Sequence, residues 1–374
     1  MSSASGTVDD LVHIASHTAL LPQIAGTEPS ARTLDALIVP TKRPGSLQPA
    51  IKLAAEIGCP LVVLCSAEEQ AREVPVPEPA DNVILTYVPP ALADGQFTFR
   101  TSTHPDIEIE PTCHIDIARK RNLALLLARM CGWRTLMYLD DDIRGLTSSA
   151  VTHATQLIGA FRAASFKIED FPDNSVICHA HRLAGAEQNV FPGGSALVAD
   201  VSQSDSFFPP VYNEDWLFLF DAVQNRSLVT AGTLSQLAYD PFARPARATS
   251  EEFGDVIAEG LYRLVHERAS VADATLDYWR LALDRRGQLI DDIATRLISR
   301  NPVDPVIGSA LMSLAAARKR LAGITPVGCV SFIRAWQSDL SDWRSRLQTL
   351  PLLGDPRDAA KFLNLTIIDT KAAR

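Results

Sequence analysis

Three adjacent carboxylates, Asp140, Asp141 and Asp142, follow the apolar stretch 135–139, which the sequence predicts to be a buried strand. Neighbouring carboxylates repel each other, so a divalent cation that neutralises them would make the cluster tolerable. In an extended segment residues two apart share a face. Asp140 and Asp142 could therefore point together at Mg²⁺ or Mn²⁺, which prefer oxygen ligands, while Asp141 turns away or contacts a sugar. A solvated acidic turn or a helix N-cap explains the same run.

A second group of candidate residues follows the first predicted strand, residues 34–40. Pro40, Thr41 and Arg43 stand where backbone groups, a hydroxyl and a cation could hold a nucleotide base and its ribose. An ordinary strand-to-helix turn with proline at its corner explains the pattern as well. The glycine-rich phosphate motifs GxGxxG and GxxxxGK[ST] are absent from the sequence, so a phosphate would have to be bound by other groups.

A basic run at residues 119–122 marks the predicted start of the helix that precedes the acidic strand. It reads Arg119, Lys120, Arg121 and Asn122. A basic cluster at a helix N-terminus, with the helix dipole behind it, favours a bound phosphate. A solvated basic turn is the alternative.

Two later motifs complete the candidate set. The paired glycines Gly193 and Gly194 let a backbone approach a ligand closely, or form a plain turn. Glu214 and Asp215 open an apolar run behind an asparagine. Asparagine or aspartate before a helix is a cap by default. The functional interpretation makes one of the two carboxylates a general base, with Trp216 as a pocket wall or as part of the core.

The elements that must position these residues alternate between strands and helices. The sequence predicts strands at 34–40, 60–66, 82–88 and 135–139, and helices at 46–57, 67–74 and 115–131. Such alternation with short connections indicates a mostly parallel sheet covered on both faces. The carboxyl ends of its strands then lie along one edge, where open sheets bind ligands. This edge would bring together Thr41, Ser66 and the acidic cluster.

The rest of the chain is predicted to become helical. Strands are predicted at 176–180 and 195–199, a helix at 213–223 and a mixed strand and turn at 228–239. The later segments 251–267, 272–299, 305–322 and 330–347 all follow helical spacing. His179 and His181 would share one face of a strand, but no second pair of zinc ligands lies at a suitable spacing. We expect an extension at 1–32, a nucleotide-binding and catalytic domain at 33–248 and a helical region at 249–374.

Composition narrows the class of protein. The chain has 374 residues, 47% apolar and 21% charged, which are globular values. With 35 Lys and Arg against 44 Asp and Glu, the net charge is −9, and without a long basic block nucleic acid is a poor candidate partner. Six scattered cysteines without a CxxC pair predict reduced thiols in the cytoplasm. Neither a signal peptide nor a membrane span is expected.

The order of these motifs resembles the GT-A glycosyltransferases, especially the family 2 class. The residues that carry the resemblance are PTKRP after the first strand, ARKRNLAL in the helix, LDDD at the strand end, GGSAL and NEDW. The match covers about residues 34–240. The acidic strand end corresponds to the family's Asp-x-Asp motif, and the Glu-Asp pair corresponds to its acceptor-side motif. The resemblance implies a GT-A α/β fold with a mixed, mostly parallel sheet.

The resemblance also implies a role for each candidate residue. Asp215 would be the general base, with Glu214 next in line. Asp142, together with Asp140, would hold Mn²⁺ or Mg²⁺ on the donor diphosphate. The implied donor-binding residues are Pro40, Thr41 and Arg43 in the nucleotide pocket, Ser66 beside the base, Arg121 and Asn122 at the nucleotide or its phosphates, Asp140 and Asp141 at the ribose or sugar, and Gly193 and Gly194 beside the donor sugar.

These roles describe a transferase that moves a sugar from a nucleoside-diphosphate donor, UDP by class frequency, to an unknown acceptor, with inversion. Nucleotidyltransferases, nucleotide-sugar mutases and a non-catalytic binding protein are the alternatives. Nucleotidyltransferases usually have a glycine-rich loop after their first strand, whereas Gly45 is the single glycine after the first predicted strand of this chain. The helical region would shape the acceptor pocket or mediate homo-oligomerisation.

Overall fold

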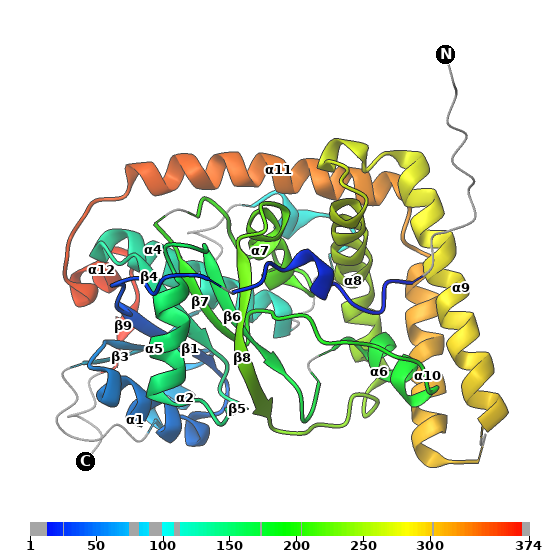
Figure 1. Cartoon of the computed structure of the whole chain (residues 1–374), viewed down its shortest axis with the longest axis horizontal. Helices are drawn as coiled ribbons and strands as arrows, with labels where there is room; N and C mark the ends of the chain where they lie inside the picture. The colour runs from blue at the N-terminus through cyan, green and yellow to red at the C-terminus, as the bar shows by residue number, and fades with distance from the viewer. Residues whose placement is uncertain are drawn as a thin grey trace. The chain divides into compact units, whose positions relative to one another are not determined.

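The computed structural model describes residues 13–24, 26–74, 82–89, 99–107, 113–172, 174–202, 204–300 and 303–368. The chain divides into two compact units that interleave along the sequence. Figure 1 shows the helices and strands, coloured by position in the sequence. Unit 1 takes its described residues from Met1–Thr18, Asn174–Asn189 and Asp240–Val330, and unit 2 takes its residues from Ala19–Asp173, Val190–Tyr239 and Ser331–Arg374. The boundaries at 32 and 248 stay a prediction.

Unit 2 contains the β-sheet. Its strands are β1 (Ala36–Thr41), β2 (Leu61–Cys65), β3 (Val83–Tyr87), β4 (Thr135–Leu139), β5 (Ile143–Arg144), β6 (Ala163–Ile168), β7 (Ala196–Asp200), β8 (Leu228–Gln236) and β9 (Thr366–Ile367). In the described part of the chain they form one nine-stranded sheet in the order β5-β8-β6-β7-β4-β1-β2-β3-β9.

The sheet is mixed. The pairs β1–β2, β1–β4, β2–β3 and β6–β8 are parallel, whereas β4–β7, β6–β7, β5–β8 and β3–β9 are antiparallel. The predicted α/β class and the strands predicted at 34–40, 60–66, 82–88, 135–139 and 195–199 are confirmed. The parallel part is the one that the strand and helix alternation indicated.

Helices form in all the predicted helical segments, although α2 is shorter and α8 and α11 are longer than predicted. Those of unit 2 are α1 (Gln48–Ile57), α2 (Glu68–Arg72), α4 (Cys113–Cys131), α5 (Ser148–Leu157), α7 (Glu214–Gln224) and α12 (Pro356–Phe362). Those of unit 1 are α6 (Val176–Leu183), α8 (Pro245–His266), α9 (Leu276–Arg300) and α10 (Pro305–Leu321). Helix α11 (Pro326–Thr349) has residues in both units. Short 3-10 helices lie at Thr18–Leu20, Pro44–Ser46, Thr101–Thr103 and Val271–Asp273.

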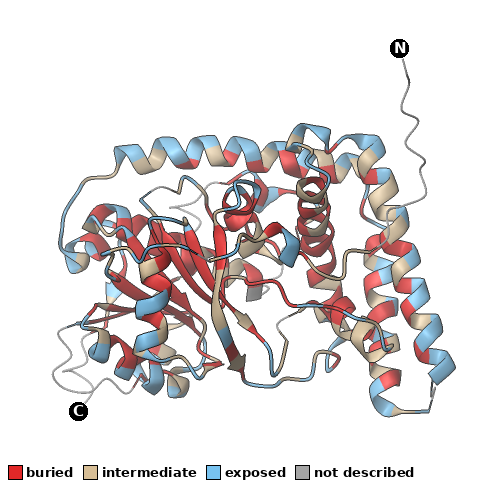
Figure 2. Ribbon diagram, in the orientation of Figure 1, coloured by how far each residue is buried: buried red, intermediate tan, exposed pale blue. Residues whose placement is uncertain are grey.

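The two faces of the central strands pack against different helices. Leu37 of β1 lies in register between Leu61 of β2 and Met137 of β4, and all three belong to a core cluster that includes residues of α1 and α5. Tyr138, on the opposite face of β4, donates a hydrogen bond to the carbonyl of Arg121 in α4. Both faces of the strand are therefore buried, as Figure 2 shows in red, which explains the continuous apolar runs in the sequence.

The prediction of a strand at 176–180 is wrong, because these residues begin helix α6. The hydroxyl of Ser175 accepts a hydrogen bond from the backbone N–H of Cys178 and caps the helix. A short apolar run does not distinguish a buried strand from a buried helix. Residues two apart in a helix do not share a face, so the arrangement of His179 and His181 that suggested zinc is not formed.

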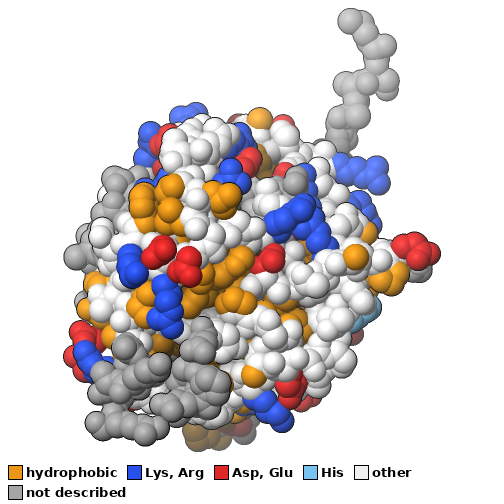
Figure 3. Space-filling view, turned by 90° about the vertical axis from the view of Figure 1, so that its left-hand side faces the viewer, with side chains coloured by type: hydrophobic (Ala, Val, Ile, Leu, Met, Phe, Trp, Pro, Cys, Tyr) orange, Lys and Arg blue, Asp and Glu red, His pale blue; other side chains and the backbone are white. Residues whose placement is uncertain are grey.

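The cysteines, the helices and the surface of the described chain have the following features. Cys59, Cys65, Cys131, Cys178 and Cys329 are free thiols. Among the described residues, no helix combines the length and the hydrophobicity needed to cross a bilayer. Figure 3 shows one face of the molecule, on which hydrophobic side chains reach the surface beside acidic and basic ones.

Candidate active site

The candidate residues gather at the carboxyl edge of the parallel strands in unit 2. Thr41 is the last residue of β1 and lies in register with Cys65, the last residue of β2. Asp140 follows β4 directly. Pro40 is a buried residue of β1, in register with Leu64. The predicted meeting of the strand ends at one edge is confirmed.

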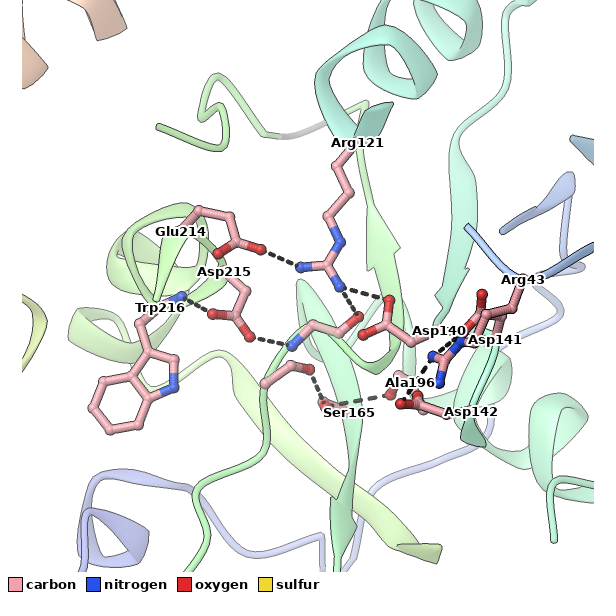
Figure 4. Close-up of polar contacts among 12 residues, drawn as sticks. Arg43, Arg121, Asp140, Asp141, Asp142, Ser165, Ala196, Glu214, Asp215 and Trp216 are labelled. Carbon is pink, nitrogen blue, oxygen red and sulfur yellow. Dashed lines mark hydrogen bonds and ion pairs between the residues drawn. The ribbon is translucent and has the colours of Figure 1, made fainter. Parts of the chain in front are cut away.

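The acidic cluster forms a turn rather than an extended segment. The backbone N–H of Ile143 donates to the carbonyl of Asp140 over 3.2 Å, because the chain must change direction before β5 pairs with β8. The alternation that would point Asp140 and Asp142 the same way therefore does not apply. Instead Asp140 contacts Arg121, whereas Asp141 and Asp142 share Arg43 (Figure 4).

Arg43 and Thr41 hold the middle of the acidic turn. The Thr41 hydroxyl donates to Asp141 Oδ2 over 2.5 Å, and the guanidinium of Arg43 donates to Asp141 Oδ1. The same guanidinium lies 3.1 Å from Asp142 Oδ2. Partial burial lowers the pKa of Arg43, but the carboxylates of Asp141 and Asp142 outweigh this effect and raise the pKa above its ordinary value.

Two kinds of divalent-ion site are conceivable at the acidic turn: an ion held by the protein alone, or an ion shared with a substrate. The carboxylates fit the second kind better. The side chains of Asp140 and Asp142 are 23% and 22% exposed. Within the described ranges, three or more His, Cys, Asp or Glu side chains do not come together as a metal-binding group. Mg²⁺ commonly takes one or two carboxylates and completes its coordination with substrate phosphates and water. The donor set at this turn matches that pattern.

The basic run 119–122 does not stand at a helix N-terminus. Helix α4 begins at Cys113, so these residues lie in its middle, where neither a dipole-bound phosphate nor a solvated turn applies. Lys120 is 1% exposed. Its ammonium group donates to the Thr41 carbonyl over 3.0 Å, to the Ser66 hydroxyl over 2.6 Å and to Asp116 over 2.8 Å. The lysine thus ties the ends of β1 and β2 to α4.

Asp116 is a member of this cluster that the sequence reasoning missed. Its carboxylate accepts from the Ser66 hydroxyl over 2.9 Å and lies 3.4 Å from the ammonium group of Lys42. Burial would raise the pKa of Asp116, but Lys120 and Lys42 outweigh it and lower the pKa. Burial lowers the pKa of Lys120, although Asp116 opposes that shift. The spacing of four between Asp116 and Lys120 was a usable signal for an ion pair on one helix.

Arg121 joins the two acidic motifs. Its guanidinium donates to Glu214 Oε1 over 2.8 Å, to Asp140 Oδ1 over 2.9 Å and to the Gly194 carbonyl over 3.1 Å. The Arg121 residue is 2% exposed and Glu214 is 6% exposed. One buried cation therefore serves two carboxylates from distant parts of the sequence.

The charge balance around Arg121 favours protonation of one carboxylate. Burial raises the pKa of Glu214 to about 8; Arg121 opposes this, and the nearby charge of Asp215 adds to it. The same carboxylates raise the pKa of Arg121 despite its burial. A single guanidinium cannot neutralise Asp140, Glu214 and Asp215 together. Glu214 is the most deeply buried of the three, and burial is the main cause of its raised pKa.

Asn122 has a different environment from its neighbour. The residue is 2% exposed. Its amide nitrogen donates to the Phe208 carbonyl over 2.8 Å, and its amide oxygen accepts from the Phe208 N–H over 2.8 Å. The asparagine therefore anchors the segment around Phe208 to α4, which is a role in the fold.

The paired glycines bring the two acidic motifs into contact with the loop after Phe191. A Cβ atom on Gly194 would lie 2.6 Å from Arg121 Nη1 and 2.8 Å from Asp215 Cβ, and one on Gly193 would lie 2.5 Å from Asp215 Oδ2. The Ser165 hydroxyl donates to the Gly193 carbonyl over 2.6 Å and holds this loop on β6. The absence of side chains here is what lets the Arg121 and Asp215 side chains approach.

Asp215 lies in the first turn of α7 and is fixed by backbone donors. Its Oδ2 accepts from the Gly194 N–H over 2.5 Å and its Oδ1 accepts from the Trp216 N–H over 2.9 Å. Asn213, which precedes the helix, has φ 60° and makes no capping hydrogen bond with its side chain, unlike the default cap. A left-handed backbone at a non-glycine residue is uncommon and is often found at functional sites.

Comparison with known proteins adds no family to this geometry. No family model matches the chain, and no curated protein matches its sequence. The functional interpretation therefore depends on the site itself.

Proposed function

We propose that this protein is a metal-dependent glycosyltransferase of the GT-A type, which transfers a sugar from a nucleoside-diphosphate sugar to an acceptor hydroxyl. One observation carries the proposal. The guanidinium of Arg121 binds Asp140 and Glu214 within 2.9 Å of each, so the acidic turn after β4 and the Glu-Asp pair of α7 are neighbours. A donor-binding motif and an acceptor-side base must be neighbours for direct transfer.

Asp215 is the proposed general base. The residue is partly exposed, and two backbone N–H groups fix the orientation of its carboxylate. In the reaction it accepts the proton of the acceptor hydroxyl while the oxygen forms its bond to the anomeric carbon. Glu214 is buried against Arg121, so we assign it to positioning the start of α7 rather than to proton transfer.

Arg43 and Asp142 are the proposed donor-side groups. The side chain of Arg43 is 53% exposed, so its guanidinium can contact the negative charge of a diphosphate. Asp142 is the residue that would hold a divalent ion, with Asp140 joining it only on leaving Arg121, and that ion would stabilise the charge developing on the departing diphosphate. Thr41 and Ser66 flank this region at the ends of β1 and β2, where a nucleoside would lie.

Replacing Asp215 with asparagine tests the proposal. We expect Asp215→Asn to lower turnover by about 10²- to 10⁴-fold, the usual range for general-base assistance, with UDP binding in Mn²⁺ unchanged. The measurement is release of the nucleoside diphosphate from a panel of nucleotide sugars, with calorimetry for binding. Asp221→Asn is the matched control, because Asp221 lies on the same helix, is 60% exposed and pairs with Arg162. Near-normal turnover of Asp215→Asn contradicts the assignment.

The panel also separates the alternatives. In a parallel assay with a nucleoside triphosphate and a sugar phosphate, release of inorganic diphosphate would indicate a nucleotidyltransferase, whereas a rearranged nucleotide sugar formed without acceptor would indicate a mutase. Hydrolysis or transfer that releases UDP, GDP or TDP supports the proposed class and identifies the base.

A further inference from the structure

Arg43 places a positive charge beside the carboxylates of the acidic turn, which repel each other. Its guanidinium contacts the carboxylates of both Asp141 and Asp142, and these three side chains lie together at the end of β4 in Figure 4. The backbone N–H of Arg43 donates to the Thr41 hydroxyl over 2.9 Å, which fixes the arginine at the end of β1. The turn is thus neutralised in part by the protein's own side chain.

The two aspartates differ in how firmly they are held. The Asp141 side chain is 5% exposed and also accepts a hydrogen bond from Thr41. The Asp142 side chain is 22% exposed, and Arg43 lies 3.1 Å from it. Because the Arg43 side chain is itself half exposed, its guanidinium can leave Asp142 without disrupting the core. Asp142 is therefore the carboxylate that can exchange one cation for another.

We propose that Arg43 is a resident cation of the acidic turn and competes with a divalent ion for Asp142. In the ligand-free protein the guanidinium occupies the carboxylate, and Mn²⁺ or Mg²⁺ binds weakly. The next step rests on the proposed function: the diphosphate of a nucleotide offers Arg43 a second anionic partner. When the guanidinium moves to the diphosphate, Asp142 becomes available.

This exchange couples the two ligands. A nucleoside diphosphate strengthens the binding of the divalent ion, and by thermodynamic reciprocity the ion strengthens the binding of the nucleotide by the same factor. The donor and the ion would then bind together, because the diphosphate takes Arg43 as its partner and leaves Asp142 to the ion. Arg43 in this role controls when the site accepts its metal.

The competition between Arg43 and the divalent ion is tested by titrating the protein with Mn²⁺ alone. Binding is measured by calorimetry and by the loss of the electron paramagnetic resonance signal of free Mn²⁺. We expect Arg43→Gln to bind Mn²⁺ about tenfold more tightly than the unmodified protein, since removing a cation beside a partly exposed carboxylate frees that ligand. Arg43→Lys keeps the charge and should stay within about threefold of the unmodified protein. The double variant Arg43→Gln with Asp142→Asn should lose the gain.

Arg72→Gln is the matched control, because Arg72 is an arginine of unit 2 that is 59% exposed and pairs with Glu68. It should leave the Mn²⁺ affinity unchanged. Equal Mn²⁺ affinity in Arg43→Gln and the unmodified protein overturns the proposal, as does a gain that survives Asp142→Asn. If Arg43→Gln fails to fold, Arg43→Ala replaces it in the same titration with Mn²⁺ alone, with the same expected gain, and an unchanged Mn²⁺ affinity overturns the proposal.

The titration is separable from the transfer reaction. A protein that releases no nucleoside diphosphate from any donor can still show the Mn²⁺ gain in Arg43→Gln, in which case the resident cation stands and the glycosyltransferase assignment fails. If instead the protein turns over a donor but Arg43→Gln and the unmodified protein bind Mn²⁺ equally, the glycosyltransferase assignment stands and the role of Arg43 as resident cation fails.

Discussion

Two buried arginines, one in each unit, hold carboxylates in different ways. Arg121 in unit 2 contacts Asp140 and Glu214. Arg286 on α9 in unit 1 donates two hydrogen bonds to Glu252, over 2.8 and 2.9 Å, and one to Asp255 over 2.5 Å. Both arginine residues are less than one-tenth exposed.

The difference lies in the carboxylates. The partners of Arg286 are both on α8, three residues apart, and their side chains are 1% and 4% exposed. The partners of Arg121 come from the end of β4 and the start of α7, and the Asp140 side chain is 23% exposed. The Arg286 cluster joins α8 and α9 and contributes to their packing. A cluster built from loop ends and open on one side can also act on a ligand.

Removing each arginine should give the largest contrast. Arg286→Met and Arg121→Met each leave buried carboxylates without a cation, which costs about 3–5 kcal/mol of unfolding free energy. Arg286→Met should leave turnover per folded molecule unchanged, whereas Arg121→Met should also lower kcat by about 100-fold or more, because Asp140 and the start of α7 lose their common partner. Urea unfolding measures the first quantity, and turnover corrected for the folded fraction measures the second.

The conservative variants sharpen this contrast. Arg121→Lys keeps the charge but not the two-pronged geometry, so it should restore stability more than kcat. Comparable losses of kcat in Arg286→Met and Arg121→Met would remove the distinction between the two clusters.

The sequence predicted the scaffold of the site better than its interior contacts. The buried strands around Leu37 and Leu61 were predictable because they form continuous apolar runs bounded by turn residues. Strand β6, which begins Ala163-Ala164-Ser165, has no such run. The segment 176–183 is apolar without a decisive period. Both were therefore missed or misassigned.

The contacts of the basic run could not be predicted for a different reason. Arg121 and Glu214 are 93 residues apart, so their pairing is a product of the completed fold and not of local spacing. The same holds for the glycine pair, because the side chains that require its small size belong to α4 and α7. The ligand contacts suggested by residue type at these positions stay predictions, whereas the contacts with other protein groups became visible only in the folded chain.

Two glycines allow a comparison of smaller effects. In unit 1 a Cβ atom on Gly260 would lie 2.5 Å from the ring of Trp279, which is fully buried. Gly260→Ala should therefore lower stability by about 1–3 kcal/mol, the usual cost of overpacking, without changing the kcat of the folded molecules. Gly194→Ala should cost a similar amount but also lower kcat more than it raises KM, because the added methyl group displaces Asp215 and Arg121.

The measurement for the glycine pair is steady-state kinetics beside urea unfolding. Gly45→Ala is the control, since nothing lies within 4 Å of a Cβ atom there. An unchanged kcat in Gly194→Ala would show that Asp215 tolerates displacement, which contradicts its assignment as the base.

Two buried glutamates give the smallest expected effect, and it depends on pH. Burial raises the pKa of Glu214 to about 8, and burial raises that of Glu251 to about 7, although Arg121 and Arg247 oppose the respective shifts. Between the ordinary value of 4.5 and the raised value, the folded chain keeps a proton that the unfolded chain has lost. Each retained proton therefore contributes its full stabilisation at a pH below the ordinary pKa, and this stabilisation is lost as the pH rises through the raised pKa.

Glutamine mimics the protonated side chain, so Glu214→Gln should become progressively more stable than the unmodified protein as the pH rises from 5 to 8. Glu251→Gln should show the same trend but reach its plateau about one pH unit earlier, because the pKa of Glu251 is raised less. Urea midpoints at pH 5, 6, 7, 8 and 9 measure both curves. Parallel curves for Glu214→Gln and the unmodified protein would mean that Glu214 is ionised throughout, so that Arg121 neutralises it fully and Asp140 is the carboxylate left to bind another cation.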